Sequence, residues 1–356
     1  MPRRTPLTAE FDATVLAAAL PRHVCAGHMR YRNFEFLAQG GKAEVYRCVD
    51  GVLGREVAFK LLLRRLGELP IEQQLLVREA RVMAALRHPS IPAVYDLGRD
   101  PDGRPYFAMG LKIGPTLHDM LSALRRNDPV VARTYDLERL VGVILKIGTA
   151  LEYAHAMNVV HCDLKPENII LEAGDAVSLV DWGLAIVDDY AEGADANPAV
   201  RQRGCQGSAL YMAPEQAAGD HFLGAGVDVY GLGALLYECL TLDTPCRGAT
   251  TAETLRNVRE REPVAPRVVA AGREIPHDLE QVCLTALAKA PHERFASMGQ
   301  LCEALRDCHT DILLNFERSN AVTRGESLWL GAWNDPYDAR RATQRHCVEA
   351  DEYFLA

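Results

Sequence analysis

The hydrophobic pattern of this 356-residue chain changes once, close to residue 110. Before that point, apolar and polar residues alternate in short runs between glycine-containing turns, which is typical of β-strands, and one helix is predicted over residues 71–87. After Thr116, apolar residues recur mainly at helical spacing. The predicted strands cover 34–37, 44–49 and 56–60, with two more ending near Met109, and the predicted helices cover 137–157, 227–240, 252–259, 279–289 and 297–308. The sequence therefore predicts an α+β chain, in which a small β-rich lobe with one main helix precedes a larger, mostly α lobe.

Charge, hydropathy and cysteine content argue against several classes of partner. The net charge of -9 disfavours nucleic acid or an anionic membrane surface as the main partner. The longest apolar stretches, 140–156 and 230–242, are interrupted by Lys146, Glu152 and Glu238, so we expect no membrane span. The ten cysteines include no Cys-x-x-Cys pair, so we expect no zinc site and interpret them as reduced thiols of a cytoplasmic protein.

A dense group of catalytic residue types lies in residues 161–168, His-Cys-Asp-Leu-Lys-Pro-Glu-Asn, and Asp181 follows in an Asp-Trp-Gly triplet. Asp163 can accept a proton from a hydroxyl group, and Lys165 can neutralise a moving phosphoryl group. Asn168 and Asp181 carry the hard oxygen ligands that Mg²⁺, or alternatively Mn²⁺, prefers. A polar loop followed by a turn at the end of a strand would explain Asp181 alone. The whole array instead predicts metal-dependent phosphoryl transfer.

The first two predicted strands are joined by a hairpin with the sequence Ala-Gln-Gly-Gly-Lys-Ala at residues 38–43. Small residues such as Gly40 and Gly41 would let backbone N–H groups approach nucleotide phosphates. Two adjacent glycines are also common in an ordinary turn, and the hairpin alone does not distinguish the two interpretations.

Lys60 ends a predicted strand, and Glu79 lies on the apolar stripe of the predicted helix that also carries Leu76, Met83 and Leu86. A carboxylate on a buried stripe needs a cation. Lys60 is the economical candidate, although a lysine at a strand end can equally be an ordinary exposed residue. An ion pair here would hold the ammonium group against the α- and β-phosphates of a nucleotide.

From about Tyr31 to Cys308, these motifs resemble the eukaryotic-type protein kinase family, specifically its serine/threonine branch and most closely its bacterial members. The chain has the family's elements in the family's order, which are a glycine-rich loop, Val-Ala-x-Lys, a helix glutamate, His-x-Asp, Asp-x-Gly and Ala-Pro-Glu. Lys165 is typical of serine/threonine kinases. The resemblance implies a bilobal kinase fold and a signalling enzyme that transfers the γ-phosphoryl group of ATP to Ser or Thr hydroxyls of a protein substrate.

The resemblance also implies a domain organisation. We expect an N-terminal extension over 1–30, a kinase domain over 31–308 and a C-terminal extension over 309–356, with the last packed on the second lobe. Within the domain, the expected parts are an N-lobe over 31–109, a hinge over 110–112 and a C-lobe over 113–308. The substrate, the upstream signal and the oligomeric state stay open.

Individual roles follow from the same resemblance. The catalytic residues would be Asp163 as base, Lys165, Asn168, Lys60 and Glu79, with Asn168 and Asp181 as metal ligands. The nucleotide would lie against Ala38, Gly40, Gly41, Val45, Ala58, Lys60, Met109, Gly110, Lys112, Ile170 and Asp181. The segment 207–216 would seat the substrate, with Ser208 hydrogen-bonded to Asp163 and Lys165, and with Glu215 paired to Arg294. The family further implies that Asp228 braces the catalytic loop and that Met83, Leu97, His161 and Trp182 stack in a regulatory column.

The chain departs from the family pattern at several positions. Ala38 and Ala43 replace the first and third glycines of the loop, which we expect to restrict positive φ and to weaken nucleotide binding modestly. Cys162 replaces the arginine that usually receives an activation-loop phosphate. The residues between Asp181 and Gly207 contain no Ser or Thr. We therefore expect activity without phosphorylation of this loop, which charge pairs would order instead. The charged residues concerned are Asp188, Asp189, Glu192, Asp195, Arg201 and Arg203.

Two other functions are compatible with parts of the sequence. A nucleotide-binding pseudokinase that acts as a signalling scaffold is suggested only by the altered glycine loop and Cys162. A small-molecule kinase of related fold would normally lack the Ala-Pro-Glu segment at 213–215. Because every catalytic position is filled, the sequence favours an active protein kinase.

Overall fold

The structure is a computed structural model that describes residues 30–187, 207–220 and 223–323, the last nine of these as backbone only. The chain divides into two compact units, residues 1–309 and 310–356. Residues 1–29 of the expected N-terminal extension, the charged residues expected to order the loop before Gly207, and the chain after Thr323 lie outside the described residues.

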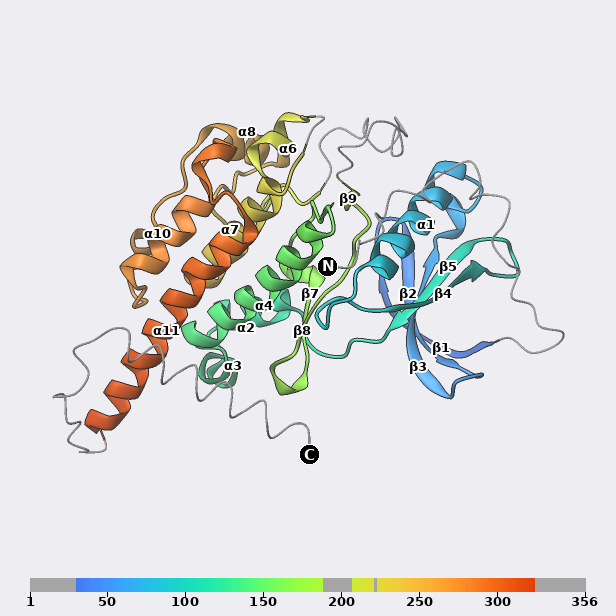
Figure 1. The fold of residues 1–356 in the computed structure, drawn as a ribbon, viewed down its shortest axis with the longest axis horizontal. Coiled ribbons are helices and arrows are strands. Elements are labelled where there is room, and N and C mark those ends of the chain that lie inside the picture. Colours follow the sequence, from blue (N-terminus) through green and yellow to red (C-terminus); the bar gives the residue numbers. More distant parts are fainter. Residues whose placement is uncertain (1–29, 188–206, 221–222, 324–356) are drawn as a thin grey trace, which may run out of the picture. The chain divides into compact units, whose positions relative to one another are not determined.

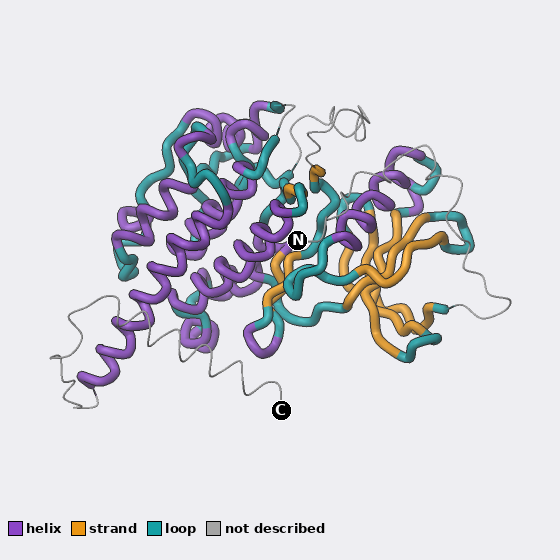
Figure 2. The backbone as a smooth tube through the Cα atoms, in the orientation of Figure 1, coloured by secondary structure: helices purple, strands orange, loops and turns teal. Residues whose placement is uncertain are grey.

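The N-terminal part of the first unit is an antiparallel five-stranded sheet with the strand order β1-β2-β3-β5-β4 (Figures 1 and 2). All five predicted strands are present. They are β1 (Tyr31–Gln39), β2 (Ala43–Asp50), β3 (Arg55–Leu62), β4 (Val94–Arg99) and β5 (Pro105–Gly110). The register places Ala58 opposite Met109 and Val45 opposite Lys60. Four of the residues expected around a nucleotide, Val45, Ala58, Lys60 and Met109, therefore lie on adjacent strands of this sheet.

Aromatic side chains form much of the core under this sheet. The rings of Phe59 and Tyr106 stack with their centroids 4.3 Å apart, and Tyr31 packs against Phe59 at 5.2 Å. Helix α1 (Pro70–Ala85) packs against β3, β4 and β5. It begins with a proline in the first turn, where no intrahelical N–H bond is needed, and it ends two residues before the predicted boundary.

The second part of the unit is helical. Its described helices are α2 (Leu117–Arg125), α3 (Pro129–Thr134), α4 (Leu137–Ala156), α6 (Pro214–Ala218), α7 (Gly226–Thr241), α8 (Thr251–Glu260), α9 (Pro266–Val269), α10 (His277–Ala286) and α11 (Met298–Thr323). Helix α7 is buried from Val227 to Leu240 and packs against α4, α9 and α10. The predicted α+β architecture is confirmed.

Some boundaries differ from the prediction. Helix α10 ends at Ala286 rather than residue 289, and Ala290, which precedes Pro291, is already extended, as residues before proline commonly are. Helix α11 continues past residue 308 to Thr323. The short helices α2, α3, α6 and α9 were not predicted, although α2 begins with a capping box formed by Thr116 and Asp119.

Two small antiparallel sheets position the central loops. Strand β6 (Val159–Val160) pairs with β9 (Ile186–Val187), and β7 (Ile169–Leu171) pairs with β8 (Val177–Leu179). The loop 161–168 connects β6 to β7, and residues 180–185 connect β8 to β9. The two motifs that suggested phosphoryl transfer are therefore enclosed by paired strand residues, Val160 with Ile186 and Ile169 with Leu179.

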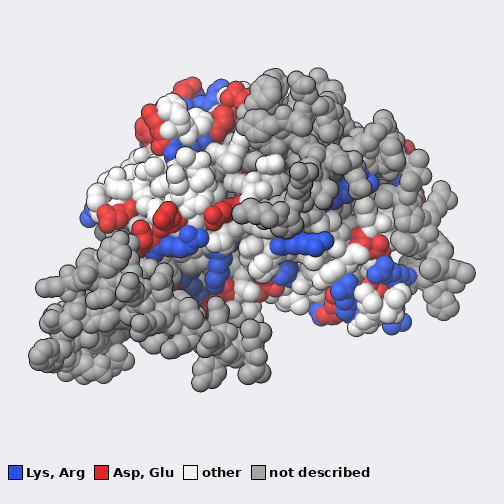
Figure 3. Space-filling model, viewed as in Figure 1, with Lys and Arg blue, Asp and Glu red and all other residues white. Residues whose placement is uncertain are grey.

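Hydropathy, cysteines and surface charge can each be located on the described residues. None of the described helices is long and apolar enough to cross a membrane. The seven cysteines within the described ranges are buried and free, whereas Cys25, Cys205 and Cys347 lie outside them. On the face drawn in Figure 3, the described basic and acidic side chains are interspersed.

Candidate active site

Three elements converge on the side chain of Lys60. Its Nζ lies 2.6 Å from Oε1 of Glu79 on α1 and 2.9 Å from Oδ1 of Asp181 after β8. The ammonium charge lowers the pKa of Asp181 to about 2, so this carboxylate is ionised at neutral pH. Burial alone would lower the pKa of Lys60, but the two carboxylates raise it above its ordinary value. Lys60 is thus a permanent cation held between two acids.

Glu79 is the buried member of this group, with 6% of its side chain exposed. Burial raises the pKa of Glu79, and the ammonium group of Lys60 opposes that rise. The pairing proposed from the apolar stripe is therefore present. Because a buried carboxylate without a cation is unfavourable, the position of α1 depends on Lys60.

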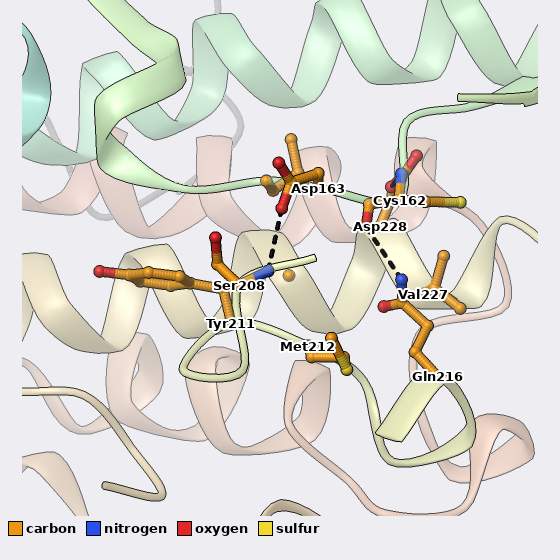
Figure 4. A pocket seen from close by; sticks show the side chains of 10 residues that line it. Cys162, Asp163, Ser208, Tyr211, Met212, Gln216, Val227 and Asp228 are labelled. Carbon is orange, nitrogen blue, oxygen red and sulfur yellow. Dashed lines mark hydrogen bonds between the residues drawn. The ribbon is translucent and has the colours of Figure 1, made fainter. Parts of the chain in front are cut away.

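Asp163 is held through both of its carboxylate oxygens. Lys165 Nζ lies 2.5 Å from Oδ2, and the backbone N–H of Ser208 donates to Oδ1 at 3.0 Å (Figure 4). Asn168 donates its side-chain N–H to the backbone carbonyl of Asp163 at 3.0 Å, which leaves the amide oxygen of Asn168 for another partner. The loop thus presents an acid, a cation and an oxygen donor at fixed positions.

Asp228 on α7 holds the start of the loop 161–168 through hydrogen bonds. Its two oxygens accept the backbone N–H groups of His161 at 2.8 Å and Cys162 at 2.9 Å, and Nε2 of His155 lies 2.7 Å away. Cys162 has a φ of 65°, in the left-handed region that non-glycine residues rarely adopt. The hydrogen bonds to Asp228 stabilise this unusual backbone geometry.

The segment 207–216 is anchored to the same loop and to α7. Gln216 donates to the backbone carbonyl of Cys162 at 2.9 Å, and the two residues line one pocket with Asp163 and Ser208 (Figure 4). Tyr211 donates its hydroxyl to Glu238 at 2.7 Å. The contact that Ser208 makes with Asp163 is through the backbone, whereas the resemblance suggested contacts with both Asp163 and Lys165.

The predicted ion pair at the end of this segment is also present. The two terminal nitrogens of Arg294, Nη1 and Nη2, each lie 2.7 Å from one carboxylate oxygen of Glu215. The Arg294 side chain is fully buried and also donates to the carbonyl groups of Gly226, Ala288 and Lys289. This bidentate pair fixes the far end of the segment to the helical lobe.

The expected nucleotide positions line the strands near Lys60. Ala58 and Met109 are buried, while Val45 and Ile170 are half-buried. The backbone N–H of Gly110 donates to the carbonyl of Ala93 at 2.9 Å, so this N–H group is not available to a base.

The Lys112 side chain reaches Glu172 at 3.3 Å, across the joint between the lobes. The chain just after this joint is packed tightly against β7. Leu171 N–H donates to the carbonyl of Pro115 at 2.9 Å. These two contacts therefore attach the joint to the helical lobe, near β7.

The glycine-rich hairpin has a backbone that alanine can adopt. Ala38, Gly40, Gly41 and Ala43 are not among the residues with positive φ, so the two alanines do not strain a left-handed backbone here. The expected weakening of nucleotide binding stays a prediction. Arg65 donates to the carbonyl of Gly41 at 2.6 Å, which holds the hairpin near the end of β3.

Known proteins identify the family. A family model described as "Protein kinase domain" matches residues 31–306. This chain belongs to the protein kinase family. The resemblance stated from the motifs and the bilobal kinase fold are both confirmed.

Bacterial kinases are among its relatives. A probable serine/threonine-protein kinase of Streptomyces coelicolor is 37% identical over 283 residues, which cover 78% of this chain and 40% of the relative. The serine/threonine-protein kinases PknB and PknE of Mycobacterium tuberculosis are 34% and 33% identical, over 86% and 80% of this chain and 48% of each relative. The chain spans about half the length of these relatives, or less.

In this kinase domain, two of the four residues expected in a regulatory column, His161 and Trp182, are in ring contact. The rings of His161 and Trp182 meet edge to face with centroids 4.6 Å apart, Met83 is buried and Leu97 is partly buried. Burial lowers the pKa of His161, which keeps the ring neutral. The indole N–H of Trp182 donates to the carbonyl of Leu179 at 3.3 Å, a bond that phenylalanine could not make.

Sequence reasoning missed several polar residues of the kinase site. Glu238 was interpreted only as an interruption of an apolar stretch, yet it binds Tyr211 and the guanidinium group of Arg125. The same argument that paired Glu79 with a cation could have found it. Gln216 gave no comparable signal, because an uncharged side chain does not require a charged partner.

Proposed function

We propose that this chain is an ATP-dependent serine/threonine protein kinase. The observation that carries the proposal is the assembled pair of sites, with Lys60 bound to both Glu79 and Asp181 and with Asp163 held beside Lys165. The family membership and the names of the relatives support the same activity. The acceptor would be a Ser or Thr hydroxyl of a protein.

In this proposal, Asp163 accepts the proton of the substrate hydroxyl, because its carboxylate is fixed by two donors at 2.5 and 3.0 Å. Lys165, already beside that carboxylate, is placed to stabilise negative charge on the transferred group. Lys60 would hold the α- and β-phosphates of ATP, with Glu79 keeping its ammonium group in place.

The residues present fit a divalent metal ion. Asp181 is ionised, with 44% of its side chain exposed, and the side-chain N–H bond of Asn168 to Asp163 leaves its amide oxygen as a ligand. We propose that these two residues hold Mg²⁺, with Mn²⁺ as the alternative. The ion would neutralise phosphate charge.

The remaining contacts of ATP are proposed from position. The base would lie between Val45, Ala58 and Ile170, with Met109 behind it and the backbone of Gly110 and Lys112 along its edge. The phosphates would lie under the hairpin that contains Ala38, Gly40 and Gly41. The substrate would bind at the segment that contains Ser208 and Glu215.

Further proposals concern organisation and regulation. We propose a kinase domain over 31–308 with extensions on both sides, and a cytoplasmic location that the seven free, buried thiols support. We also propose that activity does not require phosphorylation of residues 184–211, since Cys162 has no positive charge to bind a phosphate group on that segment. A stoichiometric phosphate there whose removal abolished activity would refute this last proposal.

A phosphorylation assay with Mg²⁺, ATP and a generic protein substrate tests the activity. The wild type should label Ser or Thr, and Asp163→Asn should lose at least about 100-fold in rate because it removes the base. Asp278→Asn, an exposed control on α10, should match the wild type. A wild type that binds ATP in a thermal-shift assay but transfers no phosphate would favour the pseudokinase scaffold instead.

A further inference from the structure

Helix α1 contacts the segment after β8 at two points through consecutive residues. Glu79 reaches Asp181 through Lys60, with the two distances of 2.6 and 2.9 Å described above. Arg78, the preceding residue, donates a guanidinium N–H to the backbone carbonyl of Ala185. The two contacts lie four residues apart on one segment, so a rotation or shift of α1 would disturb both.

Ala185 occupies a structurally important place in that segment. It is buried, and its backbone N–H donates to the carbonyl of Trp182 at 3.0 Å, which closes a turn directly after Asp181. The next residue, Ile186, pairs with Val160 in the β6–β9 sheet. Arg78 therefore holds the turn between the proposed metal ligand and the strand that lies beside the catalytic loop.

The charge of Arg78 also reaches the catalytic loop. The Ala185 carbonyl that Arg78 binds precedes Ile186, the strand partner of Val160, and the Cys162 thiol lies 3.8 Å from the carbonyl oxygen of Val160. Burial raises the pKa of the Cys162 thiol, and the nearby guanidinium group of Arg78 opposes this rise. Cys162 stands where the kinase family usually has an arginine. A cation is thus present in this neighbourhood, but it comes from α1 instead of the catalytic loop.

We propose that Arg78 is a positioning residue that couples α1 to the start of the activation segment. Arg78 takes the place of the arginine that the catalytic loop lacks at residue 162. Its partner is a backbone carbonyl group, which is present whatever the side chain and needs no phosphorylation. The turn at 182–185 then keeps Asp181 in the orientation that Lys60 and Glu79 require. This inference rests on the proposed kinase activity, and it names a device that orders the site without a phosphate.

Three substitutions on α1 test this role. Arg78→Met keeps the aliphatic stem but removes the donors, Arg78→Lys keeps a cation, and Arg81→Met is the matched control at a half-buried arginine on the same helix. We expect Arg78→Met to lower kcat about tenfold or more while KM for ATP stays within about twofold, because the loss concerns orientation rather than nucleotide contacts. Arg78→Lys should recover part of kcat, and Arg81→Met should match the wild type.

Hydrogen exchange of the peptide that covers residues 181–187 gives a readout independent of activity. Exchange at this peptide should be faster in Arg78→Met than in Arg81→Met, at an unchanged midpoint of thermal unfolding. Equal exchange and equal kcat in the two variants would overturn the proposal. A loss of kcat that follows a lowered unfolding midpoint, without recovery in Arg78→Lys, would reduce Arg78 to a structural residue. An inactive wild type would instead refute the proposed function, while the exchange comparison still decides the role of Arg78.

Discussion

Asp228 accepts the backbone N–H of Cys162 at 2.9 Å, although 66 residues separate them in the chain. The bond supports a residue with positive φ next to the proposed catalytic base. Because Asp228 also accepts the N–H of His161, one buried carboxylate fixes two successive peptide groups of the loop. The shape of the catalytic loop therefore depends on a side chain of α7.

Asp228→Asn should weaken this support. The amide has only one acceptor oxygen, so its NH₂ group would face a backbone N–H and leave a buried donor unsatisfied. We expect a loss of about 2 kcal/mol or more in the free energy of unfolding, measured with urea, together with a reduced phosphorylation rate. Asp243→Asn, at an exposed aspartate after α7, is the control and should cost less than about 1 kcal/mol. Equal losses in the two variants would contradict the bracing role.

Cys162→Arg should be destabilising in this chain even though it restores the usual residue of the family. Arg78 binds the carbonyl of Ala185, beside the β6–β9 pair that leads into Cys162, so a new buried guanidinium at residue 162 would meet a like charge. We expect a loss of about 2 kcal/mol or more by urea unfolding, and a loss smaller by about 1 kcal/mol when Arg78 is also replaced by Met. Cys162→Met adds bulk without charge, so its cost should be the same in both backgrounds. If Cys162→Arg costs the same free energy of unfolding with and without Arg78, the two residues do not interact electrostatically.

Gly114→Ala tests how firmly the joint between the lobes is fastened. An added Cβ would lie 1.9 Å from the carbonyl oxygen of Leu171, so the backbone on one side must move. We expect a loss of more than about 2 kcal/mol in the free energy of unfolding, because neither backbone can shift without losing hydrogen bonds. Gly272→Ala is the control, since no atom lies within 4 Å of its added Cβ. If both substitutions are neutral, the contact with β7 is looser than the structure indicates.

The helices that the sequence predicted are the longer ones. Helices α4 and α7 have 20 and 16 residues, whereas α3 and α9 have 6 and 4 residues and are too short for a period to emerge. The pair of Lys60 and Glu79 was predictable because a carboxylate on an apolar stripe needs a cation. The contact of Arg78 with a backbone carbonyl had no such signal, since a carbonyl group exists at every residue.

Contacts between residues far apart in the chain also limit how much of the site can be predicted from the sequence. No spacing in the sequence indicates that Asp228 reaches Cys162 or that Gln216 reaches the same residue from the other side. The former role was implied only by the family resemblance, and the latter was missed. Charge balance can suggest which residues need partners, but only the folded chain selects the backbone groups that serve them.

Glu215→Gln should show that the ion pair with Arg294 is structurally important. The substitution leaves a fully buried guanidinium group without its counter-ion, although three backbone carbonyls still accept from it. We expect the free energy of unfolding, measured with urea, to fall by about 3 kcal/mol. Glu56→Gln breaks the exposed pair with Arg47 and should cost less than about 1 kcal/mol. Similar costs for the two substitutions would mean that the buried pair contributes no more than a surface pair.

Asp50→Asn should reduce stability in a pH-dependent way. Asp50 is buried, and the hydrogen bonds from Arg30, with Nη2 at 2.8 Å, lower the pKa of its carboxyl group below the ordinary value of 3.8. A carboxyl group whose pKa is lower in the folded state stabilises the fold above the unfolded pKa, and that contribution is lost as the pH falls through the folded pKa. The wild type should therefore exceed Asp50→Asn in stability at neutral pH.

The difference in the free energy of unfolding between the wild type and Asp50→Asn should stay constant from neutral pH down to about pH 4. It should then narrow as the pH falls further. Urea unfolding at a series of pH values measures it, with Asp278→Asn as an exposed control that should follow the wild type throughout. Because Arg30 also pairs with Asp96 at 3.0 Å, Asp50→Asn leaves the guanidinium one counter-ion, and the loss at neutral pH should stay below that of Glu215→Gln. A difference that grows on acidification would show that Arg30 does not stabilise the ionised form of Asp50.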